Sequence, residues 1–510
     1  MAGIGEAEGD RRLRSIVIVG GGTAGWMAAL MLARRLEGHG IAIRVIESPD
    51  IRTVGVGEAT VPAIRDYFAE AGLDTLEVMR ATQGTVKLGI EFRDWRTPGD
   101  AFFHPFGLYG VPSYGVPFHQ YWLKRRAGGD TTPLGEYCLA TALATRNLFL
   151  PPPEQPANDL GVYDWAIHFD AGLYARYLRG VATGLGVVHT DATVTHVRTD
   201  PHNGFLAGVD TACGQTIDGD LFIDCTGFRG LLIRGALGNA YVDWTNLLPC
   251  DRAVAIPCTR TEALTPYTRS TARAAGWQWR IPLQHRVGNG YVYAGRFLSD
   301  DEAVHSLRSN LEGEALAEPN LIRFTTGHRA RFWDRNCIAL GLAAGFMEPL
   351  ESTSITLIQT GIEKLLRLLP DRDCDPALVE EYNRTTLLEY TRIRDFLILH
   401  YWANSRTGEA LWDRCRDTAL PDALAHKIRL FRARGHLVRY EWESFLDPSW
   451  LSLYAGMDVL PDRHDPLADR FTDAELGESF ARMRAAIARG VALGQPHEAF
   501  IADHCAASPP

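Results

Sequence analysis

The 510-residue sequence lacks several features that would place it outside the ordinary soluble enzymes. It has no uninterrupted apolar run of about eighteen residues, so no membrane-spanning helix is expected. Its first fourteen residues are charged and contain glycine but no apolar segment, so no export signal is expected either. Its nine cysteines include no Cys-x-x-Cys pair and no metal-ligand spacing, which favours reduced thiols and no metal site. We therefore expect a cytoplasmic protein without membrane association.

Positive charge is also scarce. There are 52 lysines and arginines against 62 aspartates and glutamates, which gives a net charge of −10. The basic residues are scattered, and the short run at residues 124–126 is typical of a solvated surface, so no nucleic-acid partner is expected. The hydrophobic content of 46% is sufficient for a large core or two closely packed domains.

The segment at residues 15–25, SIVIVGGGTAG, places a Gly-x-Gly-x-x-Gly run directly after an apolar strand. In such a run Gly20 allows a tight turn, Gly22 admits a pyrophosphate, and Gly25 lets the following helix, residues 26–36, pack closely. A second apolar strand, residues 41–46, leads to Glu47, at the position where an acidic side chain commonly binds a ribose hydroxyl. A plain βαβ unit would share part of this pattern, but the whole pattern predicts a dinucleotide site.

The dinucleotide unit is not contiguous, because strand-like segments recur at residues 221–225 and 337–340. The first of these runs into Thr226 and Gly227, where a cofactor can approach the backbone, although a simple glycine turn gives the same pattern. Residues 101–116 and 151–158 are not helical in pattern, whereas residues 356 to about 438 are. We expect an α/β fold with an interleaved core over residues 1–355 and a mainly helical cap over residues 356–510.

The stretch WQWRIP at residues 277–282 has the pattern Trp-x-Trp-x-Ile-Pro. This pattern matches a signature of the flavin-dependent halogenases typified by the tryptophan halogenases, and three further segments of the chain resemble the same family. Two aromatic residues on one face of a core strand would give the same spacing without requiring Ile-Pro. The resemblance implies that Trp277, Trp279 and Pro282 shape the active site beside the flavin.

The second segment is TVKLGIEFRDW, which contains Lys87 in an alternating strand pattern. A strand lysine is usually a solvated edge residue. The resemblance instead implies that Lys87 lies between flavin and substrate, where it hydrogen-bonds hypohalous acid or becomes a haloamine. Lysine suits either role because its pKa falls readily on desolvation.

The third segment is GFMEPLESTSI at residues 345–355. The resemblance makes Glu351 the carboxylate that accepts the proton of the reacting ring and orients the Lys87 adduct. It makes Thr353 and Ser354 the halide site, with Ser354 in place of a glycine found in some members. A structural alternative is that Ser352 and Thr353 are helix N-caps.

The fourth segment is VGVGEATVP at residues 54–62, which resembles the mobile flavin strap of the family, with Gly55 and Gly57 as its flexible points. Thr60 as a helix cap is the structural alternative. Close behind, in FFHPFG, His104 and Phe106 match positions that sandwich an indole, although a lone histidine is more often structural.

The resemblance implies an FAD-binding Rossmann-like core of the glutathione reductase and flavin monooxygenase type, with mixed sheets and a C-terminal helical substrate cap. In the segment IALGLAAG, Leu342 replaces the acidic residue of related hydroxylases, which favours a halogenase. The positions that the resemblance assigns to FAD are Gly20, Gly22, Thr23, Ala24, Gly25, Glu47, Gly57, Glu58, Ala59, Val194, Gly227, Leu342 and Ile355.

The implied activity uses FADH2, O2 and chloride or bromide to make hypohalous acid, which passes through Lys87 to an electron-rich aromatic. A separate flavin reductase would supply FADH2, and a homodimer is a habit of the family. Two alternatives stay open: an FAD-dependent aromatic hydroxylase, which needs neither Lys87 nor the tryptophan signature, and a non-enzymatic flavin-binding protein, which needs neither Lys87 nor Glu351.

The substrate is indicated by the stretch RYEWESFLDPSWLSLYAGMD at residues 439–458. Phe445 and Trp450 offer ring contacts, and Tyr440 and Glu443 offer polar ones. The Tyr-Tyr pair with which free-tryptophan halogenases hold the amino acid is missing. We therefore expect indole, a substituted indole or a larger indole-bearing molecule.

Overall fold

The computed structural model describes residues 11–49, 57–260, 263–508 of the chain. Its first layer is a six-stranded sheet, parallel apart from the edge strand β21. In spatial order its strands are β21 (Trp333–Asp334), β22 (Cys337–Ala339), β13 (Leu221–Asp224), β1 (Ser15–Val19), β2 (Ala42–Glu47) and β9 (Val188–Asp191). Strands from four distant parts of the chain thus form one sheet, as the strand-like segments at residues 221–225 and 337–340 predict.

The helix α1 (Thr23–Arg35) begins three residues before the predicted start, because Gly22 is its N-cap in extended conformation. It packs against α6 (Ala171–Gly184) and α8 (Ser354–Arg367), and its central turns are buried. Burial of the apolar residues of α1 among these helices and the sheet stabilises this layer.

A second, mixed sheet of seven strands covers the other side of the cofactor region. It carries the tryptophan signature on its central strand and the segment after Lys87 near one edge. In spatial order its strands are β19 (Asn320–Arg323), β15 (Arg252–Ala255), β18 (Val287–Tyr293), β17 (Gly276–Pro282), β16 (Thr268–Arg273), β5 (Gly89–Arg93) and β6 (Ala101–Pro105).

A small sheet joins the two segments on either side of the predicted reaction centre. Its central strand β8 (Ala166–Asp170) pairs with β3 (Gly57–Ala59) on one side and with β4 (Thr85–Lys87) on the other. The alternating segment around Lys87 is therefore two strands, β4 and β5, which belong to different sheets. The described end of the strap segment and Lys87 are held at neighbouring positions by β8.

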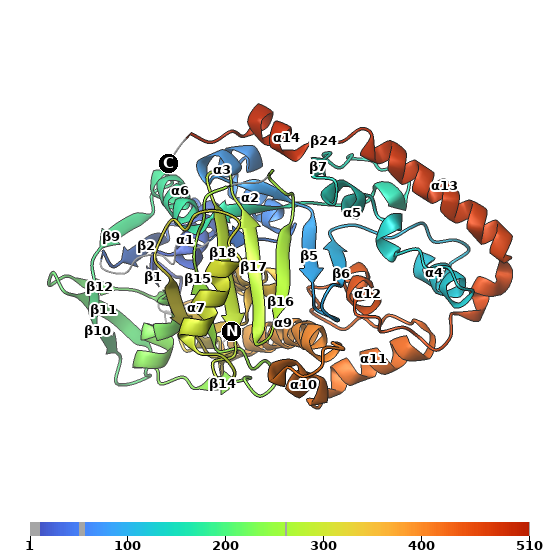
Figure 1. Ribbon diagram of the computed structural model, residues 1–510. Helices are drawn as coiled ribbons and strands as arrows, with labels where there is room; N and C mark the ends of the chain where they lie inside the picture. The colour runs from blue at the N-terminus through green and yellow to red at the C-terminus, as the bar shows by residue number, and fades with distance from the viewer. Residues whose placement is uncertain (1–10, 50–56, 261–262, 509–510) are drawn as a thin grey trace, which may run out of the picture.

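Helices gather at one end of the molecule, far from β1, β2 and β9 (Figure 1). They come from two parts of the chain, because α13 packs against α4 and α5, and β24 (Gln495–Pro496) pairs with β7 (Leu148–Phe149). These helices are α4 (Phe118–Ala127), α5 (Leu139–Ala144), α11 (Asp422–Arg434), α12 (Asp447–Gly456) and α13 (Asp473–Val491).

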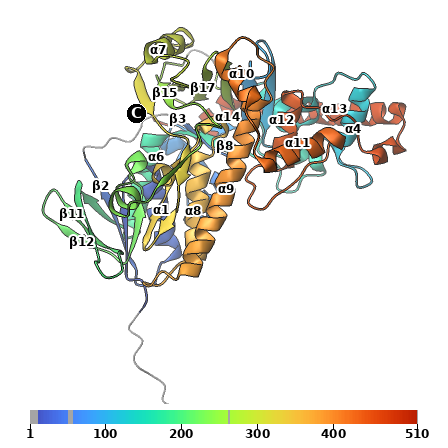
Figure 2. The ribbon, with the colours of Figure 1, turned by 90° about the horizontal axis from the view of Figure 1, so that it is seen from below.

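The long helix α9 (Pro376–Trp402) lies beside α8 and runs toward this helical end (Figure 2). Its last two turns are buried. It therefore brings side chains from its C-terminal end to the region between the sheets and the helical layer.

The remaining elements are short or peripheral. No described helix has both the length and the apolarity needed to cross a membrane. The remaining helices and strands are α2 (Ile64–Ala71), α3 (Thr75–Ala81), α7 (Asp300–Ser309), α10 (Ala410–Asp417), α14 (His497–His504), β10 (Val194–Thr199), β11 (Leu206–Thr211), β12 (Thr216–Asp218), β14 (Tyr241–Asp243), β20 (Gly327–Arg329) and β23 (Gly345–Phe346). The predicted α/β class with mixed sheets is confirmed.

Candidate active site

A cavity of about 400 Å³ lies at the carboxyl edge of the parallel sheet. The loops that follow β1, β2, β13 and β22 all contribute to its wall, because the ends of parallel strands meet at one edge. Of the residues that the resemblance assigns to FAD, all except Gly25 line this cavity. Gly55 of the strap segment lies outside the described residues.

The glycine loop leaves room for a diphosphate at the start of α1. Gly20 has φ +113°, and a Cβ there would lie 2.2 Å from the carbonyl oxygen of Cys225. A Cβ on Gly25 would lie 1.9 Å from the Gly20 carbonyl oxygen. Gly25 therefore packs against the backbone of the glycine loop and does not line the cavity. At Gly22, by contrast, no described atom lies within 4 Å of the Cβ position.

The first turn of α1 has N–H groups that no side chain caps in the described structure, and it carries no acidic residue. Such a helix start favours an anion. Glu47, at the end of β2, lines the same cavity and lies 3.2 Å from His189 and 3.6 Å from Arg179. Glycine loop, uncapped helix and acidic residue fit a dinucleotide such as FAD.

The opposite wall is apolar and aromatic. Trp277 and Trp279 of β17 line the cavity, with ring centroids 6.2 Å apart. Pro282 lies outside the wall, and its carbonyl oxygen accepts a hydrogen bond of 2.7 Å from the hydroxyl of Thr85. Pro282 thereby ties the tryptophan strand to β4, two residues before Lys87.

The described part of the strap segment is held against β8. Glu58 lines the cavity, and burial raises the pKa of its carboxyl to about 7. The hydroxyl of Thr60 donates to the carbonyl of Ile167 at 2.7 Å, whereas α2 begins at Ile64 after Ala63. The alternative of Thr60 as a helix cap is therefore wrong: its hydroxyl bonds a strand.

Lys87 is completely buried, so the alternative of a solvated edge lysine is wrong. Its ammonium donates to the carbonyl of Thr60 at 2.7 Å and to the hydroxyl of Ser352 at 2.8 Å, and lies 5.2 Å from the ring centre of Phe106. Burial lowers the pKa of Lys87 to about 7, although the charge of Glu351 opposes this effect. Ser352 lines the cavity, so Lys87 lies directly behind its wall.

Glu351 is buried between two histidines. His104 Nδ1 lies 3.0 Å from Oε2, and His400 Nε2 lies 2.8 Å from Oε1. Burial alone would raise the pKa of Glu351, but the charge of His104 and hydrogen bonds from both histidines lower it to about 2. The two histidines thus hold the carboxylate ionised.

The contacts of His400 fix where protons can lie. Its Nδ1 is 3.0 Å from the carbonyl oxygen of Phe396, which can only accept, so Nδ1 carries a proton. A bond from Nε2 to an ionised Glu351 then requires a second proton on His400.

The predicted halide residues lie where the chain enters α8. Ser352 has φ +61°, and it is followed by Thr353 as N-cap of α8. The buried hydroxyl of Thr353 has no hydrogen-bond partner among the described residues. The alternative is therefore right in part: Thr353 is the N-cap residue of α8, although its side chain makes no capping hydrogen bond. Ser352 is not the N-cap, and its hydroxyl accepts from Lys87. Ser354, the first residue of α8, lines the cavity.

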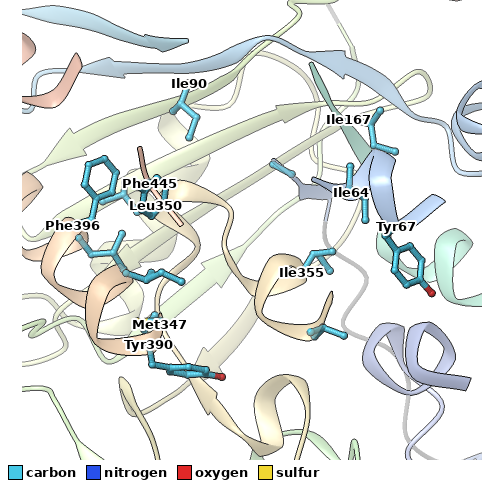
Figure 3. Close-up of a cluster of buried hydrophobic side chains, with 14 of the residues drawn as sticks. Ile64, Tyr67, Ile90, Ile167, Met347, Leu350, Ile355, Tyr390, Phe396 and Phe445 are labelled. Atoms are coloured by element: carbon cyan, nitrogen blue, oxygen red, sulfur yellow. The ribbon is translucent and has the colours of Figure 1, made fainter. Parts of the chain in front are cut away.

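An aromatic cluster that does not line the cavity lies around His104, the histidine that contacts Glu351. Phe396 and Phe445 lie side by side (Figure 3) and stack with ring centroids 4.0 Å apart. The ring centroid of His104 lies 6.0 Å from that of Phe396 and 6.4 Å from that of Phe445. His104 lies 6.4 Å from Phe106, and Trp450 lies 5.0 Å from Phe396. The structure thus brings the predicted substrate residues His104, Phe106 and Phe445 close to both Glu351 and Lys87.

Glu443, one of the two polar residues expected near the substrate, is paired with a buried lysine. Glu443 lies 2.7 Å from the ammonium of Lys427, and both side chains are almost fully buried. That ammonium also lies over the rings of Tyr440 and Trp450. Glu443 is therefore paired with a lysine of the chain through Oε1, while its Oε2 has no hydrogen-bond partner among the described residues.

Sequence reasoning missed His400, Tyr401 and Glu348. His400 and Tyr401 end a long apolar helix and carry no motif of their own. Glu348 lies within the GFMEPLESTSI segment, and its position three residues before Glu351 was the one signal that could have drawn attention to it. The lining residues Phe228, Phe346 and Tyr390 were missed for the same lack of a pattern.

Known proteins resemble this chain along most of its length. It matches the tryptophan halogenase family over residues 15–473. Tryptophan 6-halogenase ThaL of Streptomyces albogriseolus is 38% identical over 447 residues, which cover 83% of each chain. Among solved structures, BrvH, a flavin-dependent halogenase from Brevundimonas sp. BAL3, is 48% identical with a TM-score of 0.94 and covers 97% of this chain and 99% of its own.

Xcc4156, a flavin-dependent halogenase from Xanthomonas campestris, is 42% identical with a TM-score of 0.94, over 98% of this chain and 100% of its own. These similarities agree with the cavity, the tryptophan strand and the buried lysine. The chain therefore belongs to the tryptophan halogenase family, and it is an FADH2-dependent halogenase that uses O2 and a halide.

Proposed function

We propose that Lys87 carries the electrophilic halogen from the flavin cavity to an indole-type substrate beside Glu351. The observation that supports this most strongly is the place of Lys87, buried between a cavity-lining serine and a buried carboxylate. Bound FADH2 with O2 supplies the oxidising equivalent that converts a halide to hypohalous acid.

Thr353 and the start of α8 are suited to hold the halide. The unpartnered hydroxyl of Thr353 can donate to an anion, and the helix start adds N–H groups and a positive dipole end. Ser354 presents the same helix start to the cavity. No acidic residue lies in the first turn to repel the anion.

Lys87 then receives the halogen. With a pKa of about 7, a large share of the amine is neutral near neutral pH and can take the halogen from hypohalous acid with release of water. The protonated share can hold the acid by a hydrogen bond. In either form the halogen stays at Lys87. The placement of the substrate ring relative to Lys87, and not the intrinsic reactivity of the ring, then decides which carbon reacts.

Glu351 is suited to remove the ring proton. Its low pKa keeps it ionised, so one of its oxygens can accept the ring proton and Glu351 then becomes a carboxylic acid. His104 holds the second oxygen and borders the aromatic cluster. The base is therefore oriented before the substrate binds.

The substrate in this proposal is an indole without a charged amino-acid group. The support is the buried pair of Lys427 and Glu443, which neutralise each other beside Trp450. A zwitterion would have to break this pair or leave its own charges desolvated, and both are costly.

We propose in addition that a separate flavin reductase supplies FADH2 and that the protein is cytoplasmic and homodimeric. Family membership supports the reductase. All nine cysteines are free thiols, which supports a reducing compartment. Light scattering of the purified protein tests the dimer.

The test of the substrate is a comparison of indole with tryptophan. Purified protein is incubated with a flavin reductase, FAD, NADH and bromide, and brominated product is quantified by mass spectrometry. We expect kcat/KM for indole to exceed that for tryptophan by about tenfold or more. Lys427→Met should narrow this gap because it frees Glu443 for the ammonium. A higher kcat/KM for tryptophan would contradict the proposed substrate.

A further inference from the structure

Glu348 is a second buried carboxylate in the loop that carries Glu351, and the reaction described above does not use it. Only 1% of its surface is exposed. Its Oε2 accepts a hydrogen bond of 2.8 Å from the hydroxyl of Tyr401 and one of 3.3 Å from the indole N–H of Trp277. Its Oε1 has no hydrogen-bond partner in the part of the chain that the structure describes. Burial raises the pKa of Glu348 to about 7.

Burying this carboxyl costs free energy, because its unpaired oxygen loses hydration without gaining a hydrogen bond. A functional role would explain why the chain keeps a carboxyl at this position. The hydrogen bond from the indole of Trp277 indicates what that role is. Trp277 belongs to the tryptophan signature and lines the flavin cavity, whereas Glu348 and Tyr401 lie behind it.

The same helix end holds both carboxylates of the loop. His400 bonds Glu351, and the next residue, Tyr401, bonds Glu348. Between the two carboxylates lie only Pro349 and Leu350, and Leu350 is buried. The last turn of α9 thus fixes the proton acceptor on the substrate side and the tryptophan on the flavin side relative to each other.

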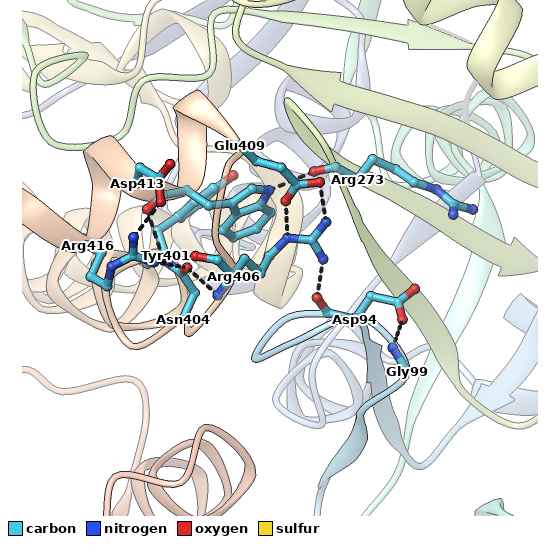
Figure 4. Close-up of polar contacts among 10 residues, drawn as sticks. Asp94, Gly99, Arg273, Tyr401, Asn404, Arg406, Glu409, Asp413 and Arg416 are labelled. Atoms are coloured by element: carbon cyan, nitrogen blue, oxygen red, sulfur yellow. Dashed lines mark hydrogen bonds and ion pairs between the residues drawn. The ribbon is translucent and has the colours of Figure 1, made fainter.

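This end of α9 is itself firmly held (Figure 4). The side chain of Asn404 donates to the carbonyl of Tyr401 at 2.6 Å. Arg406 reaches both the carboxylate of Glu409 and the backbone carbonyl of Asp94. The ring of Tyr401 stacks on Trp412 with centroids 5.5 Å apart. The hydroxyl of Tyr401 therefore has little freedom to follow a shift of Glu348.

We propose that Glu348 and Tyr401 are positioning residues that fix the indole of Trp277 at the wall of the flavin cavity, and thereby keep the oxidant on the route to Lys87. Neither residue lines the cavity; both act through Trp277. When the indole is not fixed, the wall opens transiently, and a larger share of the reducing equivalents leaves as hydrogen peroxide instead of halogenated product. In that side reaction O2 takes two electrons and two protons from the reduced flavin.

This inference rests on the halogenase activity with its relay through Lys87, so its test begins with measurements that need no turnover. The indole N–H groups of protein labelled with 15N-tryptophan are observed by NMR without flavin, and Trp277 is identified by the signal lost in Trp277→Phe. In Glu348→Leu, which removes the acceptor, we expect hydrogen exchange of the Trp277 indole to accelerate by about tenfold or more. In Glu348→Gln, which keeps an acceptor oxygen, exchange should stay near the unmutated rate.

The second measurement is the ratio of hydrogen peroxide to halogenated product. Tyr401→Phe removes only one hydroxyl, and we expect it to raise this ratio about fivefold, the worth of one hydrogen bond. The matched control is Tyr382→Phe, which removes a buried hydroxyl from the same helix, bonded to the carbonyl of Gly361 and distant from Trp277. It should leave the ratio unchanged.

A purely structural role for Glu348 and Tyr401 would lower the melting temperature and both products in parallel. An unchanged ratio in Tyr401→Phe, or an unchanged indole exchange rate in a folded Glu348→Leu, would overturn the proposal. Should Glu348→Leu not fold, Tyr401→Phe decides alone. Failure of the proposed function is distinguishable, because the unmutated protein would then make no halogenated product while its indole exchange still reported on Glu348.

Discussion

Replacing Lys87 by methionine should stabilise the protein while it destroys the activity. Lys87 is completely buried, and burial lowers the pKa of its amine from 10.5 to about 7. Methionine has a similar length and no charge, so the penalty for burying an ammonium vanishes. The change leaves the carbonyl of Thr60 and the hydroxyl of Ser352 without this donor, which offsets part of the gain.

The magnitude follows from the pKa in the two states. The gap between 10.5 and about 7 corresponds to about 5 kcal/mol. Between these pH values the unfolded chain keeps a proton on Lys87 that the folded chain has released, so the stability of the unmutated protein rises with pH. This contribution is fully present above pH 10.5 and is lost as the pH falls toward 7. The methionine variant lacks it, so its stability advantage should shrink by about 2 kcal/mol between pH 7 and pH 9.

The assay is urea unfolding of both flavin-free proteins at pH 7, 8 and 9. The quantity of interest is the difference in free energy of unfolding between variant and unmutated protein at each pH. Lys124→Met, on the partly exposed lysine paired with Asp469, controls for the change in net charge. A difference that stays constant over this pH range would refute the reasoning, because Lys87 would then not be held as a neutral amine.

Three further predictions, on the proton acceptor, the halide site and the glycine loop, test the other parts of the site. Glu351→Gln keeps the side-chain shape but removes the proton acceptor, so kcat should fall by about 100-fold or more while FAD affinity, measured by fluorescence titration, is retained; an unchanged kcat would exclude Glu351 as base. Thr353→Val should raise KM for bromide about tenfold, whereas Thr386→Val, which alters another buried hydroxyl without a described partner, should not; equal effects would remove the halide role. Gly20→Ala should lower the melting temperature of the flavin-free protein because its Cβ would meet the Cys225 carbonyl at 2.2 Å, whereas Gly22→Ala should leave that temperature unchanged and weaken FAD binding; the reverse pattern would show that the diphosphate does not approach Gly22.

The dinucleotide half of the site was predictable from sequence because its requirements are local. The glycine loop, the following helix and the acid after the second strand occupy one short segment, and each residue answers a backbone constraint such as φ +113° at Gly20. The predicted boundaries differ from the observed ones by three residues or fewer, as at the start of α1.

The burial of Lys87 was not predictable from its own segment. Alternation placed it on the polar face of one strand, whereas the chain leaves one sheet after Lys87 and enters another at Gly89. The partners that bury Lys87, the carbonyl of Thr60 and the hydroxyl of Ser352, come from 27 residues before it and 265 residues after it. Only the resemblance to a family, and not periodicity, marked this lysine.

The histidine and tyrosine at the end of α9 show the same limit. His400 and Tyr401 lie in an apolar run of a 27-residue helix, where sequence offers packing as their sole role. Their contacts with Glu351 and Glu348 depend on how α9 crosses a loop about fifty residues away in the chain. Long-range packing of this kind leaves no local pattern.

The most direct test of the central claim is the mass spectrum of products made by the unmutated protein and by Lys87→Met. Each is supplied with a flavin reductase, FAD, NADH, bromide and indole. The account predicts the isotope doublet of a single bromine for the unmutated protein and no brominated product for the variant, with FAD still bound by both. Brominated product from Lys87→Met, or halide-independent addition of oxygen by the unmutated protein, would contradict it.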